Sequence, residues 1–250
     1  MKTIKILLIM FAITVTGNSY AKSHFIIDMV KLKNKNTSIS NYLDAIQNIA
    51  KTYNGRLMVN PIHIEGQIET EVAPETTTDF DYDYIFILRF DKKSDAKKYV
   101  KDHRVEENYK SFSVLLEKQT VFLSKNMMAL PGMPKFPEID NKLMRPAPAF
   151  ILVNAIKMNM TPTPVIRMMK YFKRNYPSIT KSGTSYFSTF KVAKVLKGNF
   201  DFKMLFLTEW KSMEAFKDVH NSENFKKNVH LRNRSFKGFT EGKGRIISEN

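Results

Sequence analysis

Uninterrupted apolar runs open each half of the chain and predict buried strands. The first run covers residues 25–30 and the second covers residues 150–156, and each carries one polar side chain, Asp28 and Asn154 respectively. A strand that is apolar at nearly every position, and not at alternate ones, is typical of a sheet covered on both faces. We therefore expect both runs to lie inside a layered or closed structure.

A helical pattern follows each of these strands. Apolar residues recur every three or four positions over residues 39–53, after Ser38 as the expected cap and before Gly55 as the stop. The same spacing recurs over residues 165–176, where Pro164 suits the first turn of a helix. Each half is therefore predicted to place one long amphipathic helix after its first strand.

The remaining elements complete a βαββαβ order in both halves. We expect strands at 56–64, 84–90 and 121–124 and helices at 94–103 and 105–116, then strands at 186–195, 200–210 and within 236–247 and helices at 212–220 and 222–231. The segments 107–110 and 223–226 match in sequence and position, which indicates a duplication. Five prolines between residues 126 and 148 predict an extended linker.

The predicted architecture follows from covering these sheets. One βαββαβ unit covers one sheet face with two helices and leaves the other face bare. Placing the two bare faces together gives an α+β fold, in which two tandem ferredoxin-like repeats (22–125 and 149–250) form an intrachain dimeric α/β barrel. We expect a monomer with an internal pseudo-dimer. Its interior would be either a ligand pocket or completely filled with Phe, Met and Leu side chains.

Several short motifs in the first half support this architecture by resemblance. They are the opening strand from Phe25, Tyr42 in the helix, Tyr53-Asn54-Gly55-Arg56-Leu57 at its exit, Ile64-Glu65-Gly66 and Glu107-Asn108-Tyr109. This pattern resembles small uncharacterised domains of the dimeric α/β-barrel superfamily, which also includes antibiotic-biosynthesis monooxygenases and stress-responsive barrel proteins. The second half resembles them more faintly, because Tyr176-Pro177-Ser178 departs from the Tyr-x-Gly-Arg pattern. The resemblance implies a ferredoxin-like half-barrel and transfers no activity.

Composition and the N-terminus indicate an exported globular protein. The chain has 250 residues, of which 43% are apolar and 26% charged, which fits one large domain or two small ones. Residues 1–21 combine two lysines, a short apolar stretch and the small-x-small site Ser19-Tyr20-Ala21, as in a secretory signal peptide. The apolar stretch is about ten residues long, against the roughly 20 that cross a membrane. We expect a mature chain from Lys22 in the periplasm or fully secreted.

The two isolated polar residues of the first strands are candidates for chemistry. A polar group in an apolar strand is costly unless it forms a hydrogen bond. Asp28 and Asn154 could orient a substrate or transfer protons inside the barrel. Alternatively, each could form a structural hydrogen bond to a neighbouring strand or helix end. Together with Arg89 they are the catalytic candidates of the sequence.

Charged and aromatic residues on the matching third strands extend this candidate ligand site. Arg89 and Glu209 occupy nearly equivalent positions, so they could form an ion pair, or Arg89 could bind a substrate carboxylate. A solvated strand end is the alternative. Tyr84 and Trp210 are expected to pack beside them. The predicted ligand-binding set is Asp28, Tyr84, Arg89, Asn154, Glu209 and Trp210.

The sequence lacks the motifs that identify common enzymes. It contains no cysteine, no glycine-rich phosphate loop, no His-Glu-x-x-His and no Gly-x-Ser-x-Gly segment. Its five histidines stand apart. Met127, Met128 and Met133 could bind copper through thioethers, but such clusters are also typical of flexible core filling. We expect no metal and no cofactor, and whether the chain is an enzyme stays open.

Basic residues concentrate in the second half. The full chain has a net charge of +16. Residues 22–142 carry 18 basic and 17 acidic side chains, whereas residues 143–250 carry 20 basic and 7 acidic side chains. Near the C-terminus, aromatic residues are interleaved with cations, a composition that can bind phosphate. These cations are Lys226, Lys227, His230, Arg232, Arg234 and Lys237. Nucleic acid is a poor partner for an exported protein, so an anionic lipid or polysaccharide is expected, or else a merely solvated face.

Three functions are consistent with these observations. The first is an exported, noncatalytic protein that holds a small apolar or amphipathic anionic ligand between its repeats. The second is a cofactor-independent monooxygenase or isomerase, and the third is a protein that binds an anionic envelope surface. A mostly apolar pocket without a strongly perturbed acid or base would favour the first, and a candidate catalytic residue inside the cavity would favour the second.

Overall fold

The computed structural model describes residues 23–67, 77–126, 147–158 and 161–247. The expected signal peptide and most of the expected linker lie outside these ranges and stay predictions. The first half contains β1 (His24–Leu32), α2 (Ser40–Lys51), β2 (Gly55–Leu57), β3 (Ile62–Gly66), β4 (Thr77–Asp79), β5 (Tyr84–Phe90), α3 (Lys93–Lys101), α4 (His103–Ser113) and β6 (Leu116–Asn126). The second contains β7 (Phe150–Met158), α5 (Pro162–Lys181), β8 (Ser185–Lys197), β9 (Met204–Trp210), α6 (Met213–Asn221), α7 (Glu223–Asn233) and β10 (Phe236–Ile246).

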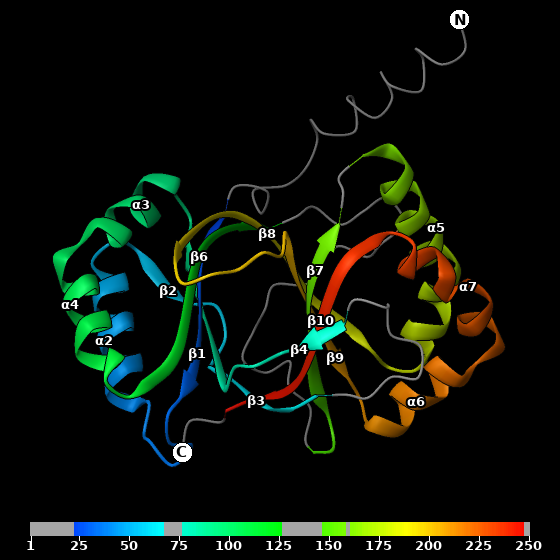
Figure 1. Ribbon diagram of the computed structural model, residues 1–250, viewed down its shortest axis with the longest axis horizontal. Coiled ribbons are helices and arrows are strands. Elements are labelled where there is room, and N and C mark those ends of the chain that lie inside the picture. Colours follow the sequence, from blue (N-terminus) through cyan, green and yellow to red (C-terminus); the bar gives the residue numbers. More distant parts are fainter. Residues whose placement is uncertain (1–22, 68–76, 127–146, 159–160, 248–250) are drawn as a thin grey trace, which may run out of the picture.

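Eight antiparallel strands of the described chain close into a barrel. Their order is β1-β6-β8-β9-β7-β10-β3-β5, and β5 pairs with β1 to complete the circle. Strands of the two halves meet at two seams, β6 with β8 and β3 with β10. Outside this circle, β2 pairs with β5, and β4 pairs in parallel with β10. Figure 1 shows the barrel in the centre, with α2, α3 and α4 on one side and α5, α6 and α7 on the other.

Apolar side chains of both halves line the barrel interior. Phe25, Ile27 and Met29 of β1 belong to the same buried cluster as Ile151 and Val153 of β7. Ring contacts link the halves across the interior, with centroid distances of 5.0 Å between Phe25 and Phe190 and 4.8 Å between Phe122 and Phe200. Since alternate residues of a strand point to opposite faces, Asp28 and Asn154 point outward, toward the helices.

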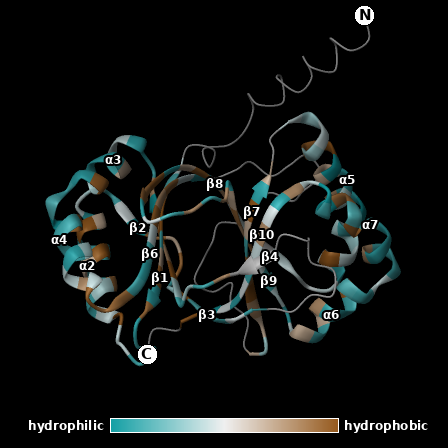
Figure 2. Ribbon diagram, in the orientation of Figure 1, coloured by the Kyte–Doolittle hydropathy of each residue, from teal (hydrophilic) through white to brown (hydrophobic). Residues whose placement is uncertain are grey.

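The helices bury the outer face of the barrel. Apolar residues of α5, α6 and α7 pack with outward-facing residues of β7 and β9 in one cluster, and those of α2, α3 and α4 pack on β1 and β5 in two others. The opposite helix faces are polar, and Figure 2 shows the hydrophilic colour over much of α4 and α7. Each helix thus buries one apolar stripe against the barrel and leaves its polar side outside.

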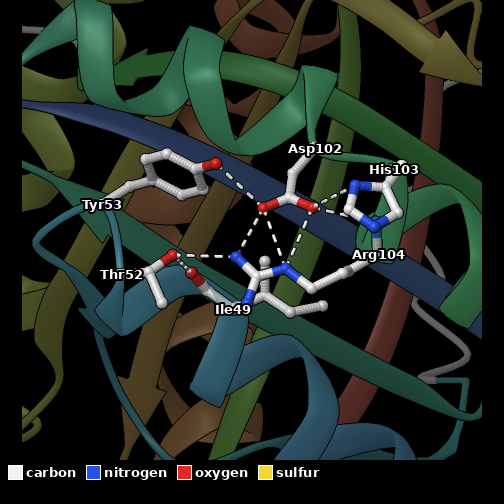
Figure 3. A network of polar contacts seen from close by, with 6 residues as sticks. All are labelled: Ile49, Thr52, Tyr53, Asp102, His103 and Arg104. Carbon is white, nitrogen blue, oxygen red and sulfur yellow. Dashed lines mark hydrogen bonds and ion pairs between the residues drawn. The ribbon is translucent and has the colours of Figure 1, made fainter.

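Polar contacts join the end of α2 to the junction of α3 and α4 (Figure 3). Asp102, the N-cap of α4, accepts hydrogen bonds from the backbone N–H of Arg104 and from Tyr53 Oη, both at 2.9 Å. Arg104 Nη2 donates to Asp102 Oδ2 at 2.6 Å and to Thr52 Oγ1 at 3.3 Å. The Arg104 guanidinium holds the pKa of the Asp102 carboxyl well below its usual range, so the cap stays charged.

Several element boundaries differ from the prediction. The strand expected at 56–64 is two strands, β2 and β3, and Pro61, which has no N–H to donate, lies between them. The helix after Ser38 begins one residue later, with Ile39 as its N-cap. Strand β6 begins at Leu116, where a helix was expected to end. Helix α5 continues through Pro177 to Lys181, although proline has no N–H and so removes one helical hydrogen bond. The last turn still packs on the protein, because Ile179 is buried.

Candidate functional site

A partly enclosed pocket lies between the outer face of the second-half strands and helices α5, α6 and α7. Its volume is about 70 Å³, and its wall is mostly apolar and aromatic. Its polar lining residues include Asn154, Thr208, His220, Arg232 and Glu241. A mostly apolar pocket with a few polar groups is the usual form of a small-molecule site. Since a cavity of about 150 Å³ holds benzene, this partly open pocket has to widen before it can hold a ligand of that size.

Glu241 is the titratable group of greatest chemical interest in this pocket. It lies in β10 directly opposite Asn154 of β7, and only 7% of its surface is exposed. Its Oε1 atom is buried and has no hydrogen-bond partner in the described part of the chain. Burial raises the pKa of the Glu241 carboxyl to about 7, while the positive charge of Arg232 opposes that rise. The carboxyl can therefore accept or release a proton near neutral pH.

Arg232 brings a positive charge to the same pocket from helix α7. Its guanidinium carbon lies 5.6 Å from the Phe225 ring centroid and 5.8 Å from that of Phe239. Burial raises the pKa of the Tyr171 phenol, and Arg232 opposes this rise as well. A partly buried cation between two aromatic faces favours an anion or an electron-rich ring beside it. The pocket thus places a cation and an ionisable acid close to an apolar wall.

The aromatic wall of the pocket keeps its histidine neutral. His220 stacks on Phe216 with a centroid distance of 3.9 Å and lies 4.2 Å from the Phe225 ring. Burial lowers the pKa of His220 to about 4, so the imidazole is neutral at pH 7. Its Nδ1 lies 2.8 Å from the Phe216 carbonyl oxygen. Because a carbonyl only accepts, Nδ1 carries the proton and Nε2 is left as an acceptor.

Trp210 completes the aromatic wall. Its indole Nε1 donates a hydrogen bond to Thr208 Oγ1 at 3.0 Å, and its ring contacts Phe216 edge-on at 4.9 Å. It is the only tryptophan of the chain, and 4% of its surface is exposed. Its fluorescence therefore reports on this pocket directly.

The corresponding space in the first half holds a bonded polar cluster. Asp28 accepts hydrogen bonds from Tyr42 Oη and from Gln119 Nε2, the latter at 3.1 Å, and Gln119 Nε2 also lies 2.8 Å from Tyr42 Oη. Burial raises the pKa of Asp28 to about 6, although both hydrogen bonds oppose the rise. The Asp28 side chain therefore bonds a helix and a neighbouring strand, and the alternative that it faces the barrel interior is wrong.

The structure separates the residues of the predicted ligand-binding set. Asn154 and Trp210 both line the second-half pocket, whereas Asp28 lies beneath the first-half helices. Arg89 and Glu209 share the inward face of their strands with the interior cluster, and Arg89 Nε lies 3.3 Å from Asp91 Oδ1.

The two aromatic candidates do not lie beside that inward-facing pair. The Tyr84 ring lies 4.9 Å from the His63 ring in a tilted arrangement, and Trp210 points outward to α6. The prediction that Tyr84 and Trp210 pack beside Arg89 and Glu209 is therefore wrong. Trp210 directly follows Glu209, so their side chains face opposite sides of β9, and Tyr84 and Arg89, five residues apart, face opposite sides of β5.

Most of the predicted surface cations are exposed. Lys226, Lys227, His230, Arg234 and Lys237 lie on the outside of α7 and at the start of β10. Arg232 differs from them, because its guanidinium lines the pocket. The helical spacing explains this difference, since Arg232 lies seven residues after Phe225 and so shares its inward face.

Glu241, His220 and Tyr171 were not among the site residues predicted from the sequence. The signal for Glu241 is weak, because its strand contains three glycines and three cations and lacks an apolar run. His220 and Tyr171 could have been found by helical periodicity, since both occupy the apolar stripe of their helices. Which stripe residues converge on one pocket depends on long-range pairing of β7 with β10.

A second hollow lies where the halves meet. It has a volume of about 370 Å³ and is lined by Val100, Val105, Glu106, Tyr109, Lys110, Leu196 and Lys197, from α3, α4 and the end of β8. Lys197 Nζ lies 5.0 Å from the Tyr109 ring centroid. Glu106 and Lys110 form an ion pair at 2.9 Å. This hollow is larger than the pocket and combines an apolar wall with a cation.

Two features expected of other protein classes are not found in the described ranges. Among these residues no three His, Asp or Glu side chains are grouped so that they could hold a metal ion. Within the same ranges, no helix has both the length and the apolar character that would let it span a membrane.

Comparison with known proteins supports the fold. No family model matches the sequence, and no curated protein matches it. Among solved structures, the chain is similar to an anthrone oxidase-like protein with a TM-score of 0.58 and 9% identity, over 93% of this chain and 94% of that one. It is also similar to a candidate monooxygenase of Fusobacterium nucleatum subsp. nucleatum, with a TM-score of 0.55 and 12% identity, over 92% and 94%.

A third similar structure is a variant chlorite dismutase from Candidatus Nitrospira defluvii. The TM-score is 0.50 at 8% identity, over 91% of this chain and 92% of that one. Identities this low show the fold alone. The chain therefore has the ferredoxin-like, dimeric α/β-barrel fold that the sequence led us to expect.

Proposed function

We propose that the chain binds a small, mostly apolar molecule in the second-half pocket and exchanges a proton with it through Glu241. The observation that carries this proposal is a buried carboxyl group with an unbonded oxygen and a pKa of about 7 in an apolar pocket. Structural carboxylates are usually hydrogen-bonded, so an unbonded one beside a hollow is typical of a functional site.

The neighbouring groups support proton transfer. When Glu241 takes a proton from a ligand O–H or C–H group, the ligand becomes an anion and the glutamate becomes neutral. Arg232 stabilises that anion, because its cation reaches the same pocket. The neutral imidazole of His220 adds an acceptor at Nε2 that can orient a ligand donor.

Proton removal also suits the enzymatic alternative, a cofactor-independent monooxygenase or isomerase. An isomerase would return the proton from Glu241 to another carbon. A monooxygenase would let the ligand anion react with dioxygen, so that one CH₂ group and O₂ give one carbonyl and one water without an external reductant. Asn154, opposite Glu241, would orient the reacting group.

Binding is tested with phenol, toluene and benzoate as matched probes. Each titration is monitored by the fluorescence of Trp210. Phenol has a donor for Glu241, toluene has the same shape without it, and benzoate has no proton to donate near pH 7. We expect phenol to bind at least about tenfold more tightly than toluene, a difference that Glu241→Gln reduces and that the exposed-site control Glu223→Gln leaves unchanged. Equal affinity for phenol and toluene in the wild type would contradict the proposal.

A second candidate function rests on the hollow between the halves. Its apolar wall of Val100, Val105 and Leu196 and its cation Lys197 fit an amphipathic anion. Octanoate titrated against protein with labelled methyl groups tests this site. We expect octanoate to shift the methyl resonances of these three residues. The shifts should disappear in Lys197→Met and persist in the exposed control Lys194→Met. Shifts that survive Lys197→Met would contradict it.

We also propose that the protein is exported and duplicated. Export rests on the signal-like residues 1–21 and predicts that protein from its own host begins at Lys22. Duplication rests on the matching strand order, since β6-β1-β5-β3 and β10-β7-β9-β8 have the same sequence of pairings. Co-expression of residues 22–125 and 149–250 as separate chains tests it, with a one-to-one complex as the expected product. Two chains that purify apart would contradict the proposal.

A further inference from the structure

Helices α5 and α7 lie side by side on the outer flank of the second half (Figure 1). Arg174 Nη1 donates to Asn228 Oδ1 at 3.0 Å, and Asn224 Nδ2 donates to the Arg174 carbonyl oxygen at 3.0 Å. At the other end of the pair, Arg167 Nη1 donates to the Arg234 carbonyl oxygen at 3.3 Å. These bonds align the two helices in antiparallel directions, so their outer surfaces form one continuous face.

This face is strongly basic. Helix α5 carries five cations and no acidic residue, and α7 has Glu223 as its one acid. We call the exposed cations of this helix pair the basic face: Lys170, Lys173, Arg174, Lys181, Lys226, Lys227 and Arg234. Clustered cations on one side raise the local potential well beyond what a mixed surface produces.

An apolar side chain lies at one end of the basic face. Ile166 is 41% exposed and begins a row along α5 that continues through Lys170, Lys173 and Lys181 at helical spacing. Over its 20 residues α5 extends about 30 Å, so the row is long and nearly straight. Lysines on the exposed side of a helix are attracted to an anionic membrane surface, and an exposed apolar residue beside them can enter its headgroup region.

We propose that the basic face docks the protein onto an anionic lipid bilayer, with Ile166 entering the headgroup region. A bilayer fits better than a compact ligand, because the cations are spread over two helices. Each cation held near an anionic leaflet changes the partition coefficient about fivefold. Three such cations therefore change it about 100-fold.

Co-sedimentation with vesicles tests the proposal. The vesicles contain phosphatidylglycerol and phosphatidylcholine at 3:7, or phosphatidylcholine alone, at 0.05 M and 0.5 M salt. We expect binding to the anionic vesicles at low salt, at least a tenfold loss at high salt, and no binding to phosphatidylcholine. Binding that is equal in both lipids or unaffected by salt would overturn the proposal, as would the absence of binding.

Charge reversal localises the surface. Lys170→Glu, Lys173→Glu and Lys227→Glu combined should lower the partition coefficient by at least about 100-fold. The matched control reverses three exposed lysines of the first half, Lys97, Lys98 and Lys101 on α3, with the same change in net charge. Equal losses in both variants would show that net charge and not this face controls binding, and would overturn the proposal.

Two further measurements complete the test. Ile166→Ser should reduce vesicle binding about fivefold at both salt concentrations, because this contribution is apolar. Polyphosphate and dextran sulfate distinguish a bilayer from other polyanions: tighter binding to either soluble polymer than to the anionic vesicles would overturn the assignment to lipid. Unchanged circular dichroism and melting temperatures show that each variant is folded.

Discussion

The substitution Glu241→Gln should stabilise the protein relative to the wild type, and this difference in the free energy of unfolding should grow as pH rises. Burial raises the pKa of Glu241 from its ordinary value of 4.5 to about 7. Between these two pH values the native protein keeps a proton that the unfolded chain has lost, so its stability falls as pH rises through this interval. Glutamine resembles the protonated acid in shape and polarity but does not titrate, so the variant escapes this loss.

The size of the effect follows from the change in proton affinity. One pKa unit corresponds to about 1.4 kcal/mol, so the free energy of unfolding of the wild type should fall by about 3 kcal/mol relative to the variant between pH 4.5 and pH 8. This value applies without reduction for solvent screening, because the Glu241 side chain is almost completely buried.

Urea unfolding followed by Trp210 fluorescence measures the difference. The wild type, Glu241→Gln and Glu223→Gln are compared at pH 4.5, 6 and 8, and the first pair should diverge progressively. Glu223 is exposed on the neighbouring helix, so its variant controls for the loss of one negative charge. A difference between wild type and Glu241→Gln that stays constant within about 0.5 kcal/mol over this range would refute the reasoning.

Three other substitutions test separate features. Asp28→Asn should show the same sign of pH dependence, because burial raises the pKa of Asp28 to about 6. Its stability relative to the wild type should increase by about 3 kcal/mol between about pH 3 and about pH 7. Parallel urea curves over this range would contradict it. Gly198→Ala should cost at least about 1–2 kcal/mol in urea unfolding, because φ is +71° and a Cβ would lie 2.2 Å from the Gln119 carbonyl oxygen. Asp102→Ala removes the α4 cap and should cost about 1–2 kcal/mol, with part recovered in Asp102→Asn; an unchanged melting temperature would exclude a stabilising cap.

The fold was predictable because the strands carry strong apolar signals. The runs at 25–30 and 150–156 lie in the central strands β1 and β7. The second half follows the predicted order of elements, whereas the first half divides the predicted second strand into β2 and β3 and adds β4. The short strand β4 was not predicted, since its three residues, Thr77 to Asp79, have no apolar pattern. Helix α5 was placed but its end was not, because Pro177 normally indicates a helix boundary.

The site was harder to predict for a physical reason. Strands β1 and β7 are buried on both faces, so alternation does not show which residues face the interior and which face the helices. The sequence therefore identified Asp28 and Asn154 as unusual but did not show to which face of the sheet their side chains point. Glu241 lies 87 residues from Asn154, and only the pairing of β7 with β10 brings them opposite each other.

The two seams of the barrel have a consequence for biosynthesis. The final strand, β10, covers the open edge at β3, and β8 covers the other open edge at β6. A nascent chain that has emerged only to residue 126 therefore exposes the apolar inner face of its sheet. It also exposes two edge strands whose backbone groups have no hydrogen-bonded partner strand. The edge at β6 stays uncovered until β8 is synthesised, and the edge at β3 stays uncovered until β10 is synthesised. Closure must come late and over long sequence separations, a combination that slows folding and leaves the half-made product prone to self-association.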